Sequence, residues 1–216
     1  MGLFKFIMGE EPSIFEKAAF FIKNGDDKGA YGEWLTEYMF GSARLKGYSK
    51  SLHNIYVPYK GRTSEIDVML IHEKGIFVIE SKNYSGWIFG SAEQQKWTQC
   101  INKNTKEQFY NPIKQNRTHI NALSEFIKMD KSKIKSFIVF SERCELKKVP
   151  ENTEEYTITK RDNLLTLIKK EIEEKDNIFS KDEVNEIEEK LKPLTNVSEE
   201  EKKKHIKDIK ERYGDK

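Results

Sequence analysis

The sequence is poor in cysteine and has no long apolar runs. Only two cysteines, Cys100 and Cys144, stand in 216 residues, and they form no C-x-x-C pair. Such spacing argues against a thiolate zinc cluster, and so few thiols argue against a disulfide framework and fit a reducing compartment. No stretch approaches the roughly 20 apolar residues of a membrane span, and the opening MGLFKFIM lacks a signal-peptide layout. We therefore expect a soluble, cytoplasmic protein with no membrane span.

An excess of charge of one sign is also missing. Lysine and arginine number 38 against 36 acidic residues, a net charge of +2. A chain-wide electrostatic signal for nucleic acid is therefore absent, and any basic surface must be local. The chain does contain 37% hydrophobic and 12% aromatic residues, enough to build a core. Its length suits one domain with appendages, because domains usually run to roughly 100–200 residues.

The spacing of apolar residues changes from helical to strand-like and back along the chain. The connector 72–75 is short, which predicts an antiparallel hairpin between the strands on either side. The second strand of that hairpin is apolar on both faces, as in a central strand covered on both sides. Asn111-Pro112 is typical of an N-cap followed by proline at the first helical position, so the helix there starts at 108 or near 111. The pattern predicts helices at 13–23, 30–41, 108–128, 161–175 and 181–194, and strands at 52–57, 64–71, 75–81, 134–140 and 156–158.

This order predicts a mixed α+β protein of the α/β type, with one central mixed sheet flanked by helices. We expect three regions: an N-terminal helical segment at 1–28, a main domain at 29–160, and a helical, charge-rich C-terminal extension at 161–216. From residue 196 onward the chain is nearly all charge, which indicates a solvated helix or a frayed tail.

Glu80-Ser81-Lys82 ends the predicted central strand. Residues two apart in a strand share a face, so the Glu80 carboxylate and the Lys82 ammonium should lie side by side. Glu-x-Lys occurs six times in this chain, and a surface ion pair is the ordinary interpretation of such a tripeptide. Glu80 differs because it ends an apolar strand, where unpaired charge costs several kcal/mol. This copy is therefore the candidate for chemistry.

Asp67 lies in the middle of the preceding predicted strand, between Ile66 and Val68. If the hairpin closes over 72–75, Asp67 lies across from the neighbourhood of Glu80. Two converging carboxylates make a hard-oxygen site that suits Mg²⁺ or Mn²⁺ better than zinc. Lys82 beside them could position or activate a water, or stabilise charge on a phosphate. The pattern therefore indicates phosphodiester hydrolysis.

An Asp followed by Glu-x-Lys at the end of the next strand resembles the PD-(D/E)xK nuclease superfamily. The wider run is similar to the nuclease-related domain (NERD) family over roughly residues 29–128, through Gly32-Glu33, Ile66-Asp67-Val68, the run Gly75 to Gly86, Trp97, and the run Asn111 to Asn116. The superfamily's proline before the Asp is absent, since Ile66 stands there. The resemblance implies a restriction-endonuclease-like core, with Asp67, Glu80, Lys82 and Gln115 as catalytic residues and Glu33, Asp67 and Glu80 as metal ligands.

Each further residue also has an ordinary structural interpretation. Without the resemblance, Glu33 would be a solvent-exposed helix carboxylate and Gln115 a helix-surface amide. His119 lies one turn beyond Gln115 and could face the same cleft, but we expect a satisfied surface histidine. Trp97 we expect in the core or a loop, not as a base-stacking platform.

The leading hypothesis is a Mg²⁺-dependent (or Mn²⁺-dependent) nuclease that acts on DNA in DNA processing or defence. The first alternative is a degenerate domain of the same fold that binds nucleic acid without cutting it. The second is a protein-interaction module whose C-terminal helices dock a partner protein. The complete Asp67, Glu80 and Lys82 set favours the enzyme.

Overall fold

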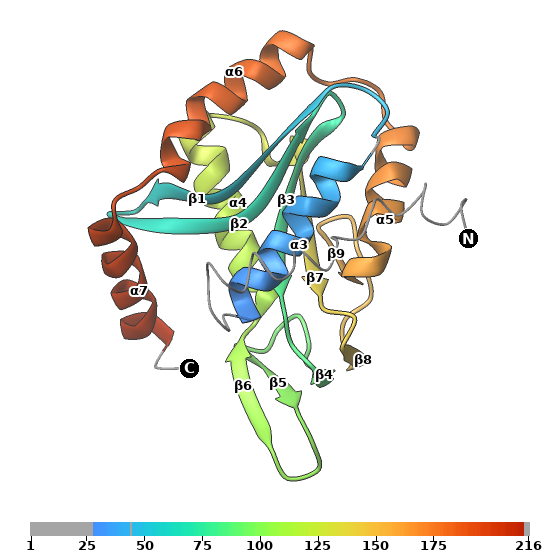
Figure 1. The fold of residues 1–216 in the computed structure, drawn as a ribbon, viewed down its shortest axis with the longest axis vertical. Coiled ribbons are helices and arrows are strands. Elements are labelled where there is room, and N and C mark those ends of the chain that lie inside the picture. Colours follow the sequence, from blue (N-terminus) through green and yellow to red (C-terminus); the bar gives the residue numbers. More distant parts are fainter. Residues whose placement is uncertain (1–27, 44, 214–216) are drawn as a thin grey trace.

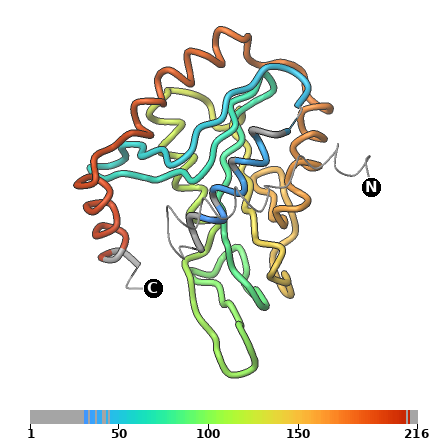
Figure 2. The backbone as a smooth tube through the Cα atoms, in the orientation of Figure 1, coloured from blue at the N-terminus to red at the C-terminus, as the bar shows by residue number. Residues whose placement is uncertain are grey.

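The computed structural model describes residues 28–43 and 45–213 (Figures 1 and 2). The helix predicted at 13–23 and nearly all of the segment 1–28 lie outside these residues. The described part contains a five-stranded mixed sheet with the strand order β1-β2-β3-β7-β9. Its strands are β1 (Ser49–Tyr59), β2 (Arg62–His72), β3 (Gly75–Lys82), β7 (Ile134–Phe140) and β9 (Tyr156–Lys160). The predicted mixed α+β class with a central sheet is confirmed.

The predicted hairpin is present. Strands β2 and β3 pair antiparallel, with Val68 opposite Ile79 and His72 opposite Gly75. On its other side β3 pairs in parallel with β7, so β3 is central, as its apolar pattern predicted. Strand β1 is longer than predicted and continues through Pro58. Proline is tolerated there because β1 lies at the edge of the sheet.

Helices cover both faces of this sheet (Figure 1). Helices α4 (Pro112–Ile127) and α6 (Lys181–Leu191) bury Ile120, Leu123, Val184 and Leu191 against one face. Helices α3 (Lys28–Ser42) and α5 (Arg161–Glu174) cover the other face, where the buried residues include Phe40, Leu164, Leu165, Ile168 and Ile172. The packed layers therefore extend into the predicted C-terminal extension, and the division of the chain at 160 stays a prediction.

A second sheet, which the sequence pattern did not predict, follows β3. Its strand order is β6-β5-β4-β8, and it projects from the end of the main body at which α4 begins (Figure 1). Glycine permits its tight start, because Gly86 has φ +76 and a Cβ there would collide with the carbonyl oxygen of Cys100. Its strands are short: β4 (Gly86–Phe89), β5 (Lys96–Cys100), β6 (Lys106–Tyr110) and β8 (Cys144–Lys148).

The C-terminal residues form helix α7 (Glu199–Tyr213), which lies beside β1 and β2 (Figure 1). Within its described side chains only His205 is buried. Its imidazole Nδ1 lies 2.8 Å from the Thr63 hydroxyl, and its ring makes an edge contact with Tyr56. In the described part of the chain, none of the helices is long and apolar enough to cross a bilayer.

Candidate active site

The carboxyl end of β3 carries the two central charges of the site. Glu80 is 1% exposed and Lys82 is 7% exposed. Strand periodicity directs both side chains to the face that α4 covers, as the two-residue spacing predicted. The Lys82 ammonium lies 2.6 Å from Glu80 Oε1 and donates a hydrogen bond to Gln115 Oε1 at 3.1 Å. A buried ion pair thus ends the central strand, with its cation tied to the next helix.

Asp67 lies where β2 separates from β3. The backbone pairing of the hairpin ends at Val68 and Ile79, so Asp67 and Glu80 are the next positions on the two strands. The half-buried Asp67 carboxylate accepts a hydrogen bond from the backbone N–H of Ser81 at 2.8 Å. Its side chain therefore continues the strand pairing and holds a second carboxylate beside Glu80.

His119 belongs to this site, and the prediction of a surface histidine was wrong. The imidazole is buried, and its Nε2 lies 3.1 Å from Glu80 Oε2, while its Nδ1 lies 2.6 Å from the Ser64 hydroxyl. An ionised carboxylate only accepts hydrogen bonds, so Nε2 carries a proton and donates to Glu80. The spacing of His119 one turn after Gln115 was the available signal. Its buried acidic partner on another element could not be read from the sequence.

Helix α4 is fixed at its start, which places Gln115 and His119. Asn111 caps the helix by accepting from the N–H of Ile113 at 2.9 Å, as predicted. The buried Asn116 amide donates to the carbonyl of Val78 and to the Ser136 hydroxyl, at 3.1 and 2.8 Å. Helix α4 is therefore tied by hydrogen bonds to both β3 and β7, next to the site.

The electrostatic environment keeps both central groups ionised. Burial alone would raise the pKa of Glu80, but the Lys82 ammonium and the His119 hydrogen bond outweigh it and hold that pKa below its ordinary value. Burial alone would lower the pKa of Lys82, but the negative charges of the Glu80 and Asp67 carboxylates outweigh it and help raise that pKa above its ordinary value. The site therefore holds a carboxylate and an ammonium at neutral pH.

The arrangement offers two carboxylates to a cation. Asp67 and Glu80 present oxygen ligands of the kind that Mg²⁺ and Mn²⁺ prefer. Glu33, the third ligand implied by the resemblance, lies in helix α3, but its side chain is outside the described part of the structure. Within residues 28–43 and 45–213, no group of three or more His, Cys, Asp or Glu side chains is arranged to hold a metal ion. Asp67 and Glu80, on adjacent strands, are therefore the oxygen donors of the site that the described part of the structure offers to a cation.

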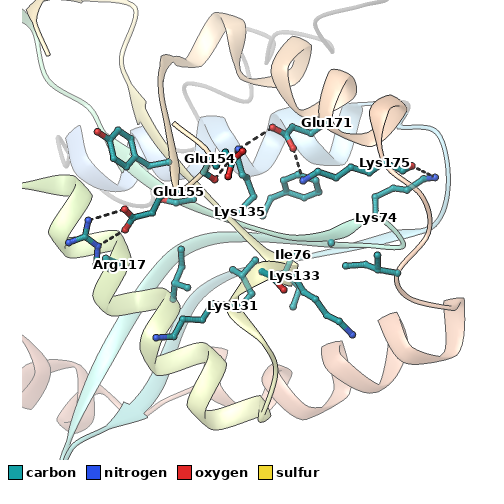
Figure 3. A pocket seen from close by; sticks show the side chains of 18 of the residues that line it. Lys74, Ile76, Arg117, Lys131, Lys133, Lys135, Glu154, Glu155, Glu171 and Lys175 are labelled. Atoms are coloured by element: carbon teal, nitrogen blue, oxygen red, sulfur yellow. Dashed lines mark hydrogen bonds and ion pairs between the residues drawn. The ribbon is translucent and has the colours of Figure 1, made fainter. Parts of the chain in front are cut away.

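A described pocket lies elsewhere in the molecule. It has a volume of about 840 Å³ and opens at the other end of β3, around Gly75 and Ile76 (Figure 3). None of Asp67, Glu80, Lys82 and Gln115 lines it. Three of its six lining cations form ion pairs with lining carboxylates: Arg117 with Glu155 at 2.5 Å, and Lys135 and Lys175 with Glu171 at 3.3 and 2.7 Å. The six cations are nearly balanced by five lining carboxylates, so the pocket has little net charge with which to bind a phosphate, and we place the candidate site at the carboxylate cluster.

Comparison with known proteins agrees with this geometry. The family model of the nuclease-related domain matches residues 28–141, more than half of the chain and all of the candidate residues. The chain belongs to the nuclease-related domain family. The general placement of this family is in the PD-(D/E)xK superfamily, so the resemblance seen in the sequence is confirmed.

A curated relative extends the likeness beyond the NERD domain. An uncharacterized protein of Bacillus anthracis is 34% identical over 189 residues, which are 87% of this chain and 86% of that protein. Similarity therefore continues past residue 141 into the C-terminal helices. No solved structure matches the chain. The roles of Asp67, Glu80, Lys82 and Gln115 in this NERD protein stay predictions that the geometry supports.

Proposed function

We propose that this NERD protein is a metal-dependent nuclease that hydrolyses phosphodiester bonds in DNA, in DNA processing or defence. The observation that carries the proposal is the buried Glu80, held between Lys82 and His119 and placed beside Asp67. A purely structural core would rarely retain such a cluster, because buried charge that is not fully compensated costs several kcal/mol. Perturbed and paired ionisable groups of this kind concentrate at functional sites.

The two carboxylates have the role of metal ligands in this proposal. Asp67 and Glu80 would hold Mg²⁺ or Mn²⁺, with Glu33 as the third ligand implied by the family resemblance. When bound, such an ion supplies charge stabilisation at phosphate and lowers the pKa of a water. The Ser81 N–H orients Asp67, and His119 orients Glu80, so the ligand oxygens are placed before a cation arrives.

Lys82 stabilises negative charge in this proposal and does not act as a base. Its raised pKa keeps the ammonium protonated at neutral pH. The ammonium has three N–H groups. Glu80 and Gln115 accept two of them among the described residues, which leaves one for a phosphate oxygen. Gln115 therefore positions the ammonium.

The test is cleavage of linear, circular and single-stranded DNA and of RNA, each with Mg²⁺ and with Mn²⁺. We expect metal-dependent cutting of DNA that Glu80→Gln abolishes, because the carboxamide keeps the shape of the side chain but loses its charge. Glu173→Gln is the matched control, since Glu173 begins another Glu-x-Lys and is exposed on α5. Circular dichroism shows whether each variant is folded.

The outcomes separate the hypotheses. Cutting by folded Glu80→Gln at the parent rate would contradict the proposed centre. Binding of DNA without any cutting by the parent would favour the degenerate, nucleic-acid-binding alternative. Cutting of RNA alone would retain the chemistry and correct the substrate.

A further inference from the structure

One face of the second sheet carries a set of aromatic and basic side chains that the hydrolytic centre does not use. Pairing of β4 with β5 places Trp87 opposite Cys100 and Phe89 opposite Thr98. Their neighbours Ile88 and Gln99 are buried on the reverse side, so this first face points outward. We call it the outer face, and it comprises Trp87, Phe89, Lys96, Thr98, Cys100, Lys106, Gln108, Tyr110, Glu145, Lys147 and Lys148.

The outer face is strongly basic, whereas the chain as a whole is nearly neutral. Lys96, Lys106, Lys147 and Lys148 are all exposed there. The acidic residue on this face is Glu145, which lies 2.5 Å from Lys147. The whole chain has a net charge of only +2. The local basic surface that a polyanion requires is therefore present on this sheet.

Trp87 lies at the middle of the outer face and is 45% exposed. It is flanked by Lys147, whose Nζ lies 5.4 Å from the centre of its ring. The half-buried Phe89 lies two residues further along the same strand. Exposed aromatic rings among cations are the elements with which proteins bind unpaired bases and their backbone phosphates.

We propose that the outer face binds single-stranded nucleic acid, with a base stacked on Trp87 and phosphates paired with the lysines. A base can stack on a protein ring only when it is unpaired, which favours single strands over duplex. Strand β4 begins at Gly86, four residues after Lys82, so the sheet that bears this face follows directly from the end of β3 that carries the candidate centre. This inference rests on the proposed nuclease function and names its substrate form.

The first experiment measures binding without cleavage. A fluorescent single-stranded DNA of about 16 nucleotides is titrated with Glu80→Gln in the absence of divalent metal. Adding Trp87→Ala should weaken binding roughly 5- to 150-fold, the range for loss of one stacked base. Ile178→Ala is the matched control, because Ile178 is 39% exposed on another part of the surface. An equal affinity for duplex, or no effect of Trp87→Ala, overturns the proposal.

The lysines have a matched control of their own. The double variant Lys96→Ala/Lys106→Ala should reduce the steepness of the plot of log affinity against log salt concentration by about 1.4. Each phosphate contact to a single strand contributes about 0.7 to this slope. Lys170→Ala with Lys207→Ala should leave it unchanged, because these exposed lysines lie on α5 and α7. If the affinities of the two double variants depend equally on salt, the proposed contacts of Lys96 and Lys106 with phosphates are overturned.

Cys100 supplies a readout in the unmutated chain. It is half-buried on the outer face, whereas Cys144 is buried and burial raises the pKa of its thiol to about 11. Alkylation at neutral pH therefore reports on Cys100. Single-stranded DNA should slow this alkylation, and an unchanged rate at saturating DNA overturns the proposal.

The proposed function and the proposed surface can fail independently. Binding that depends on Trp87, with no cleavage under any condition, contradicts the nuclease and supports the surface. Cleavage that depends on Glu80, with no binding of single strands at the outer face, contradicts the surface alone. If the outer face binds a protein partner and no nucleic acid, the proposal for this face is contradicted as well.

Discussion

Glu80 is a carboxylate that the sheet buries almost completely, and its neighbours determine its chemistry. Oε1 lies against Lys82 and Oε2 against His119, so both oxygens are engaged by groups from β3 and α4. Leaving a buried charge without its partner typically costs 3–5 kcal/mol. Changes at this site therefore affect stability and chemistry together, and each prediction below separates the two.

At the scale of the residue, Lys82→Ala should reduce turnover far more than metal binding. The ammonium cannot ligate Mg²⁺, so its removal leaves both carboxylates free to do so. Loss of its charge at the phosphate should slow cleavage by roughly 10²–10³-fold, as for other electrostatic catalytic groups. Calorimetry gives the metal affinity and single-turnover cleavage gives the rate. Cleavage at the parent rate would remove Lys82 from the mechanism.

Acid stability is a second prediction for the same pair of residues. The folded pKa of Glu80 lies below its ordinary value of 4.5, so its ionisation stabilises the fold above pH 4.5. That contribution is lost as pH falls from 4.5 through the folded pKa. The contribution of Lys82 to stability has the opposite dependence on pH. It is present below pH 10.5, the ordinary pKa of lysine, and is lost as the pH rises through the raised pKa of Lys82 in the folded state.

Urea unfolding at a series of pH values measures these contributions. We expect the free energy of unfolding to fall below pH 4.5 in the parent and to fall less steeply there in Glu80→Gln, whose amide does not titrate. If the free energy of unfolding falls equally steeply below pH 4.5 in the two proteins, Glu80 is not held ionised by its neighbours.

The candidate residues differ in how far the sequence could predict them. Glu80 and Lys82 follow from strand periodicity, because a charged pair at the end of an apolar strand stands out locally. The position of Asp67 follows from the short connector. The role of His119 could not be predicted in this way, since it depends on contact with Glu80 and Ser64, each on a different strand.

At the scale of the element, Asn111 links α4 to the second sheet. Its two side-chain N–H groups are shared among the carbonyls of Ser91, Ala92 and Gln94, in the loop between β4 and β5, and its side-chain oxygen caps the helix. Asn111→Ala should cost about 2–4 kcal/mol of stability, from a lost cap together with the loss of hydrogen bonds to part-buried carbonyls. Urea unfolding measures the loss.

The same substitution should also slow cleavage, because Gln115 and His119 follow the cap on α4. The half-buried Asn121 lies further along this helix, and Asn121→Ala serves as the control, with an expected change within about 0.5 kcal/mol. Equal stability of the two variants would refute the role assigned to Asn111.

Long elements were predictable and the second sheet was not. The longer helices and strands repeat apolar residues over several turns or pairs, and the structure confirms those that fall within the described residues, with shifts at their ends. Strands β4, β5, β6 and β8 have only four or five residues each, and in β5 only Trp97 and Gln99 are buried. So few apolar positions produce no strand pattern, because the inner face of this sheet is completed by residues from distant segments, such as Phe140.

At the scale of the whole molecule, removal of residues 196–216 should leave the main body folded. Within the described part of α7 only His205 is buried, and Ile206 and Ile209 remain exposed. Loss of the Thr63 hydrogen bond and the Tyr56 ring contact should cost about 1–3 kcal/mol. Thermal unfolding of the shortened chain is the measurement. A loss of cooperative unfolding would show that α7 is an integral part of the core.

The account as a whole depends on Asp67 and Glu80 forming one cation site. Isothermal titration calorimetry of Mg²⁺ into the intact chain, each single variant (Asp67→Asn and Glu80→Gln) and the double variant tests this most directly. The account predicts that the parent binds Mg²⁺, that each single substitution greatly weakens binding, and that the second substitution adds little to the first. Mg²⁺ affinity equal to that of the parent in the folded double variant would contradict it.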